Sequence, residues 1–181
     1  MRVAVCTGSF DPVTNGHVDI FERTALLFDK VVVAVFENPQ KKPLFSTSEK
    51  MEMIRKSVAH ISNIEVDSFD GLLSEYMRDH NYSVVVRGLR AFIDFEYEFQ
   101  RALLLKQIAP ELETMFMMTN NKMSFISSSG VKELATFGGD ITKMVPSEIV
   151  ETVLERIRRK WPMQDNQWKT KAIGRIQELI L

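Results

Sequence analysis

The residues most able to do chemistry in this sequence are residues that bind phosphate. The segment from Gly8 to His17 reads GSFDPVTNGH and directly follows a short apolar run. Gly8 allows backbone amides to approach a phosphate closely, and His17 falls in the first turn of the expected helix, whose free amides attract anions. A lone histidine there is more often an ordinary surface residue, and the glycines around His17 are what favour a phosphate site.

Two arginines form a second candidate anion site. Arg87 and Arg90 come directly off an expected strand, where two guanidinium groups indicate an anionic ligand. Salt bridges to Asp94, Glu96 or Glu98 are the alternative. Both explanations hold if one arginine is tethered and the other is free for phosphate. Glu98 itself is equally well explained as part of a solvated helix face.

A run of serines at residues 127–129 precedes a short apolar stretch and offers hydroxyls and amides at a helix start. A simple N-cap, which needs only one serine, is the alternative. The usual dinucleotide and P-loop fingerprints, GxGxxG and GxxxxGK[ST], do not occur in the chain. Hydride transfer and P-loop chemistry therefore lose their main support.

Alternating strands and helices must position these segments. Apolar, β-branched runs predict strands at Val3–Thr7, Lys30–Glu37, Ile64–Ser68, Ser83–Arg87 and Glu113–Met118. Amphipathic spacing and capping signals predict helices from near His17, from Ser46 to Val58, Leu72–His80, Asp94–Ile108, Ser128–Phe137, Pro146–Lys160 and Asp165–Leu181. This alternation requires crossovers, hence a Rossmann-like, doubly wound parallel sheet of five strands with helices on both faces, plus C-terminal helices. The fold class is α/β.

In such a sheet the ligand lies beyond the carboxyl ends of the strands. The candidate residues follow the ends of different strands: Ser9 and His17 the first, Lys41 the second, and Arg87 and Arg90 the fourth. The serines at 127–129 follow the fifth. We therefore expect all of these segments to converge on one pocket.

Composition excludes several classes. A length of 181 residues favours one domain, which we place at residues 1–160, with residues 161–181 as a helical extension. A net charge of -1 provides no global basic field for nucleic acid or an anionic membrane. Cys6 is the single cysteine, which excludes an intrachain disulfide and favours the cytoplasm. We expect no signal peptide, and the longest apolar stretch, Val31 to Phe36, is too short to span a bilayer.

Two of these segments resemble signatures of a known family. GSFDPVTNGH resembles the adenylylation motif of the nucleotidyltransferase superfamily, and ISSSGVK at residues 126–132 resembles its second signature. Together with ENPQKKPLF, VVVRGLRAFIDFEYEFQ and APELETMFM, they make residues 1 to about 160 similar to the phosphopantetheine adenylyltransferase family of the bacterial coenzyme A pathway. Residues beyond about 160 exceed the usual family length.

The resemblance implies a reaction: ATP and 4′-phosphopantetheine give dephospho-coenzyme A and pyrophosphate, with Mg²⁺ and no direct protein ligand for the metal. It also implies a homohexamer built as a dimer of trimers, with coenzyme A as a candidate feedback ligand.

The resemblance further implies residue roles. His17 stabilises the transition state, and Lys41, in a loop between prolines, bridges the acceptor phosphate and the α-phosphate of ATP. The family commonly has Thr at the position of Ser9, which keeps the hydroxyl, and an aromatic residue at that of Met123, which leaves the adenine-side packing open. The implied phosphopantetheine ligands are Ser9, Lys41, Leu73 and Arg87. The implied ATP ligands are Ser9, Phe10, His17, Gly88, Leu89, Arg90, Glu98, Met123, Ser124, Phe125, Ile126, Ser127, Ser128 and Ser129.

Two other functions remain as alternatives. The first is a related nucleotidyltransferase that acts on nicotinamide mononucleotide, or on a phosphorylated alcohol with CTP; the segments around Lys41 and Arg87 argue against it. The second is a nucleotide-binding regulatory module without catalysis, which the intact His17 and Lys41 weigh against.

Overall fold

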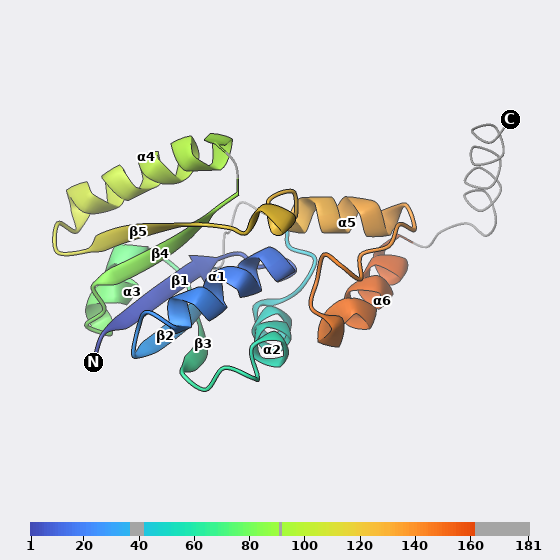
Figure 1. Ribbon diagram of the computed structural model, residues 1–181, viewed down its shortest axis with the longest axis horizontal. Helices are drawn as coiled ribbons and strands as arrows, with labels where there is room; N and C mark the ends of the chain where they lie inside the picture. The colour runs from blue at the N-terminus through green and yellow to red at the C-terminus, as the bar shows by residue number, and fades with distance from the viewer. Residues whose placement is uncertain (37–41, 91, 162–181) are drawn as a thin grey trace, which may run out of the picture.

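The chain forms a single parallel sheet with its helices on both faces (Figure 1). The computed structural model describes residues 1–36, 42–90 and 92–161. The strands are β1 (Val3–Gly8), β2 (Lys30–Phe36), β3 (Ile64–Phe69), β4 (Val84–Leu89) and β5 (Glu113–Met118), in the spatial order β3-β2-β1-β4-β5. The helices are α1 (Asn15–Ala25), α2 (Thr47–Ser57), α3 (Leu73–Asp79), α4 (Phe92–Ile108), α5 (Ser128–Thr136) and α6 (Val150–Lys160). The predicted α/β fold class and five-stranded parallel sheet are confirmed.

The two faces of the sheet bury separate apolar layers, because successive side chains of a strand point to opposite faces. Along β1, Ala4 and Cys6 face α1, α2, α5 and α6, whereas Val5 faces α3 and α4. Val33 and Ala34 of β2 divide in the same way. Both faces are covered, which explains why the central strands read as continuous apolar runs.

The order of the strands reverses between β1 and β4, since β2 and β3 extend to one side of β1 and β5 lies on the other. Val5 pairs with Val32 on one side and with Val85 on the other. A crevice forms at such a point beyond the carboxyl ends of the strands. Gly8 and Arg87 lie at this end of the sheet, and Arg90 directly follows β4.

Two predicted elements differ from the structure. Pro146–Lys160 is not one helix: Ser147–Ile149 forms a 3₁₀ turn, and α6 begins afterwards. Ile149 is fully buried with φ -119°, so its packing interrupts the helix. In addition, Gly88 and Leu89 belong to β4, because pairing with Met117 and Met118 prolongs the strand past its predicted end at Arg87. The helix predicted from Ser46 is confirmed as α2, and Ser46 and Glu49 form a capping box at its start.

The helix predicted at Asp165–Leu181 lies outside the described residues, as does most of the extension at 161–181. Within residues 1–36, 42–90 and 92–161, no helix has the length and apolar character needed to cross a bilayer.

The close approach of Gly8 to the Phe10 ring predicts a stability difference between two glycine positions. A Cβ at Gly8 would meet Phe10 ring carbons at 2.9 Å, whereas one at Gly16 would meet its nearest atoms at 3.6 Å. We expect Gly8→Ala to lower the free energy of unfolding by about 1 to 3 kcal/mol through overpacking. The control Gly16→Ala should leave it unchanged or raise it by about 0.4 to 1 kcal/mol. Urea unfolding at fixed protein concentration compares the two, and equal effects would contradict the account.

Candidate active site

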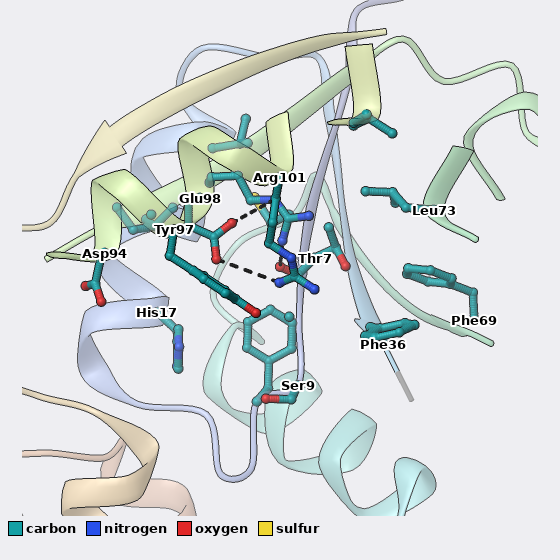
Figure 2. Close-up of a pocket in the computed structure, with 18 of the residues that line it drawn as sticks. Thr7, Ser9, His17, Phe36, Phe69, Leu73, Asp94, Tyr97, Glu98 and Arg101 are labelled. Atoms are coloured by element: carbon teal, nitrogen blue, oxygen red, sulfur yellow. Dashed lines mark hydrogen bonds and ion pairs between the residues drawn. The ribbon is translucent and has the colours of Figure 1, made fainter. Parts of the chain in front are cut away.

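A cavity of about 640 Å³ opens at the carboxyl ends of β1 and β4 (Figure 2). The loop after β1 supplies Ser9 and Phe10, and α1 supplies His17. The strand β4 supplies Arg87 and Gly88. The start of α5 and one side of α4 complete the wall. The predicted convergence of the loops that follow β1, β4 and β5 is therefore observed.

The side chain of His17 is held by the residue that caps its own helix. Thr14 is the N-cap of α1, and its backbone N–H donates to Nδ1 of His17 at 3.0 Å. In return the backbone N–H of His17 donates to Oγ1 of Thr14. Because Nδ1 accepts a hydrogen bond, a neutral imidazole must carry its proton on Nε2. The cap therefore fixes the tautomer as well as the start of the helix.

The surroundings of His17 favour its neutral form. Burial, and secondarily the positive charge of Arg90, lower the pKa of His17 to about 4. The ring lies edge-on to Phe10, with centroids 5.1 Å apart, and is stacked over Phe21 at 6.5 Å. At neutral pH, His17 thus presents a neutral, oriented N–H donor at the N-terminus of α1.

The backbone of Phe10 is strained next to this donor. Its φ of 43° lies in the left-handed region, which is uncommon for an aromatic residue. The ring is buried and packs against Phe21 at 5.4 Å. Such strain persists only where the surrounding structure over-determines it, and it gathers at functional sites.

The carboxylate of Asp11 joins three segments of the wall. It accepts hydrogen bonds from the backbone N–H groups of Leu44 and Phe45 at 3.0 to 3.1 Å and from Nζ of Lys132 at 2.9 Å. Burial alone would raise the pKa of Asp11, but these donors hold it below its ordinary value. One buried anion therefore ties together the loop after β1, the chain entering α2, and α5.

The N-terminus of α5 lies at the same cavity. Oγ of Ser127 accepts from the backbone N–H of Gly130 at 2.9 Å and caps the helix. Oγ of Ser128 donates to the carbonyl oxygen of Pro12 at 2.8 Å. One serine is therefore a cap, as the simpler interpretation holds, and a second binds α5 to the loop after β1. Residues 127–129 all line the cavity.

Both arginines of the second candidate site have carboxylate partners. Arg90 is bound to Asp94 through two hydrogen bonds of 3.0 and 3.1 Å, and it also donates to the carbonyl oxygen of Ile126. Arg87 lies 3.5 Å from Glu98 and donates to the carbonyl oxygen of Thr7. The prediction of one tethered and one free arginine is wrong, because α4 presents a carboxylate to each.

The predicted site residues separate into three groups. Lys41 lies outside the described residues. Leu89 and residues 123–126 do not line the cavity, since Leu89 and Ile126 are buried in the protein and Phe125 is 71% exposed. The cavity wall contains Ser9, Phe10, His17, Leu73, Arg87, Gly88, Arg90, Glu98, Ser127, Ser128 and Ser129.

Several residues of the wall were not among the predicted ones. Phe36 and Phe69, at the ends of β2 and β3, form an apolar side together with Leu73. Tyr97 and Arg101 come from α4 (Figure 2). The sequence could have indicated this side of α4, because Asp94, Glu98 and Arg101 are spaced by four and three residues and therefore share one helix face. That face is directed into the cavity.

Comparison with known proteins was made by sequence and by structure. The profile of the cytidylyltransferase-like family matches residues 5–134. The chain is 48% identical over 159 residues to the phosphopantetheine adenylyltransferase of Shouchella clausii, which covers 88% of this chain and 100% of that protein. It is 51% identical over 168 residues to that of Heliobacterium modesticaldum, covering 91% and 100%.

A solved structure from Vibrio parahaemolyticus, described as a nicotinate-nucleotide adenylyltransferase, superposes with a TM-score of 0.62. The match covers 86% of this chain and 96% of that one at 15% sequence identity. At that identity the likeness concerns the fold.

The cap on His17 predicts that its imidazole stays neutral in the free protein, with the proton on Nε2, from pH 5.5 to pH 8. A pKa of about 4 places the titration well below this range. Imidazole ¹⁵N chemical shifts measure both the charge and the tautomer, and the signals of His17 are assigned by their absence from His17→Gln. A titration midpoint near the ordinary value of about 6.5, or a proton on Nδ1, would contradict the prediction.

The hydrogen bonds and the ion pair of Asp11 predict that Asp11→Asn lowers the free energy of unfolding by an amount that depends on pH. The amide nitrogen of Asn would face backbone N–H groups or Lys132, and leaving such buried groups unpaired costs about 1 to 3 kcal/mol. Because the folded-state pKa lies below the ordinary 3.8, this contribution is fully present above that value and is lost as the pH falls through the folded pKa.

Urea unfolding at several pH values measures the effect. The difference between the parent and Asp11→Asn should be constant near neutral pH and shrink in acid, whereas exposed Asp79→Asn should change little. A difference that does not depend on pH would show that the charge of Asp11 does not hold the three segments together.

Proposed function

The chain belongs to the phosphopantetheine adenylyltransferases within the cytidylyltransferase-like family, and on that premise we propose how its residues carry out the reaction. The reaction transfers the adenylyl group of ATP to 4′-phosphopantetheine and gives dephospho-coenzyme A and pyrophosphate, a step of coenzyme A biosynthesis. The observation that carries the proposed roles is the convergence of an oriented neutral His17, the arginines of the β4 end and the N-terminus of α5 on one cavity.

The chemistry requires neither a nucleophilic side chain nor a general base. The acceptor phosphate is already an anion, and one of its oxygens attacks the α-phosphorus of ATP while the bond to pyrophosphate breaks. Catalysis then consists of positioning the two substrates and stabilising the charge of the transferred group. Glycines, helix amides, cationic side chains and one imidazole supply both.

His17 stabilises the transferred group. Its Nε2–H, fixed by the hydrogen bond from Thr14, donates to a non-bridging oxygen of the α-phosphate. Charge builds on these oxygens as the bonds rearrange, so this hydrogen bond becomes stronger in the transition state than in bound ATP. A neutral donor also avoids a proton transfer, which the reaction does not need.

The two substrates bind at different ends of the cavity. The N-termini of α1 and α5, with residues 127–129 and Arg90, bind the phosphates of ATP. Ser9 and Arg87 bind the acceptor phosphate, and Leu73, beside Phe36 and Phe69, contacts the pantetheine arm. Lys41 bridges the two phosphates, and Gly88 admits the nucleotide close to β4. Of the residues that the resemblance assigns to the adenine side of ATP, Glu98 lines the cavity, whereas Leu89 and residues 123–126 lie outside its wall.

Magnesium enters this site with ATP. No group of three or more His, Cys, Asp or Glu side chains that could hold a metal ion occurs among the residues that the structure describes. The cavity instead presents N–H donors and cations, and the two nearest carboxylates, Asp94 and Glu98, face arginines. This donor set fits an ion held by the phosphate oxygens of ATP, where Mg²⁺ neutralises negative charge.

Self-association into a homohexamer is part of the proposal. Supporting it, large apolar side chains remain exposed on α4 and β5, among them Phe99 at 42%, Leu103 at 55% and Met118 at 61%. Exposed apolar clusters of this kind mark protein interfaces. The protein acts in the cytoplasm, and coenzyme A, which contains the pantetheine arm, competes for the same cavity as a feedback ligand.

Pyrophosphate release tests the function directly. The protein is incubated with ATP and, in turn, with phosphopantetheine, nicotinamide mononucleotide and a phosphorylated alcohol, the last also with CTP. Release should require ATP and phosphopantetheine together. Release only with another acceptor, or tight ATP binding without turnover, would overturn the proposal.

Replacement of His17 tests its role in the transition state. We expect His17→Ala to lower kcat by about a hundred- to a thousandfold, since loss of one such donor costs about 2.7 to 4 kcal/mol. ATP affinity should change little, because the interaction is made mainly in the transition state. The control His60→Ala removes an imidazole paired with Glu22 on the surface and should leave kcat unchanged. If weaker ATP binding were the only defect of His17→Ala, the assignment would be wrong.

A further inference from the structure

Arg101 lies in the cavity without a role in the scheme above. It projects from α4, and both Arg101 and Arg87 face the carboxylate of Glu98. Figure 2 shows Arg101 between Glu98 on one side and Leu73 on the other. The guanidinium carbon lies 5.1 Å from the centroid of the Tyr97 ring, a cation–π contact that orients it. The side chain of Arg101 nevertheless remains 46% exposed. It is therefore an oriented cation that is still accessible to a ligand.

Glu98 only partly satisfies the two guanidinium groups. Its Oε2 lies 3.5 Å from Nε of Arg87, and its Oε1 lies 3.9 Å from Nη1 of Arg101. Both distances exceed the 2.7 to 3.2 Å of ordinary N–H to O hydrogen bonds. The buried Oε2 has no hydrogen-bond partner among the described residues. Glu98 thus balances charge without using the hydrogen-bond donors of either arginine.

The cluster of Arg87, Glu98 and Arg101 carries one uncompensated positive charge. Two cations face one carboxylate, and the side chains of Arg87 and Glu98 are only 16% and 20% exposed. Burial lowers the pKa of Arg87, Glu98 opposes that shift, and the charge of Arg101 adds to it. Burying the guanidinium of Arg87 close to a second cation is unfavourable unless an anion joins them.

We propose that Arg101 is a second guanidinium ligand of the acceptor phosphate, beside Arg87, and that it makes the site select acceptors carrying a phosphate monoester. This inference rests on the proposed function. The acceptor is the expected partner because Arg101 shares Glu98 with Arg87, the proposed ligand of the acceptor phosphate, and lines the same cavity as Phe36 and Phe69. The helix N-termini that receive ATP are beside His17, on the other side of the cavity.

Binding measurements with two acceptors test this role. Titration calorimetry compares phosphopantetheine with pantetheine, which has a hydroxyl in place of the phosphate, for the parent, Arg101→Gln and Arg101→Lys. The matched control is Lys106→Gln, which removes a positive charge from the same helix at a residue paired with Glu113. We expect Arg101→Gln to weaken phosphopantetheine binding by about tenfold or more, the loss of one charge-assisted hydrogen bond.

The remaining binding measurements distinguish this role of Arg101 from other roles. Pantetheine and ATP should bind Arg101→Gln as they bind the parent, and Arg101→Lys, which keeps the charge without the planar fork, should lose less affinity than Arg101→Gln. Equal losses for both acceptors would make Arg101 part of the cavity wall, and a loss confined to ATP would place it on the nucleotide; either result overturns the inference. If the parent itself fails to release pyrophosphate with phosphopantetheine, the proposed function fails instead.

Discussion

The active site depends on a buried carboxylate that no substrate needs to touch. Asp11 gathers two backbone N–H groups at residues 44 and 45 and the ammonium of Lys132, which belong to segments far apart in the sequence. With Asp11 ionised, the loop that leads to His17, the chain that enters α2 and the helix α5 are held as one unit. Glycine at residue 8 and the left-handed Phe10 then let that loop turn back over α1.

Within this arrangement we attribute catalysis to the orientation of the site residues. Thr14 donates to one nitrogen of His17 and leaves the other as a donor, so the imidazole is ready before ATP arrives. The start of α5 adds further N–H groups at the same wall. Fixed donors cost no reorganisation during the reaction, which is why a site built from amides and cations suffices for adenylyl transfer. Exposed apolar side chains on α4 lie on the same helix as Asp94, Glu98 and Arg101, so the proposed oligomer interface and the cavity wall share one element.

The sequence was most informative where a local pattern determines the structure. The β-branched runs predicted all five strands, and the position of His17 after Gly16 predicted a donor at a helix N-terminus. It was least informative where partners are distant in the chain. Nothing local to Asp11 indicates that it meets Lys132, 121 residues away. The carboxylate for Arg87 was foreseen only as an alternative to phosphate, because helix spacing shows which residues share a face and not what that face meets. For the same reason Glu98 fitted a solvated helix face equally well, and Arg101 was not predicted, although both line the cavity.

The central claim is that adenylyl transfer proceeds here through an oriented neutral donor, with no proton transferred in the transition state. The solvent deuterium isotope effect on the chemical step, measured in single-turnover pyrophosphate release, tests it most directly. The account predicts an effect close to unity in the parent, and His17→Ala should lower the rate without changing that effect. A large normal isotope effect in the parent that disappears in His17→Ala would show His17 acting as a general base or acid, and would contradict the account.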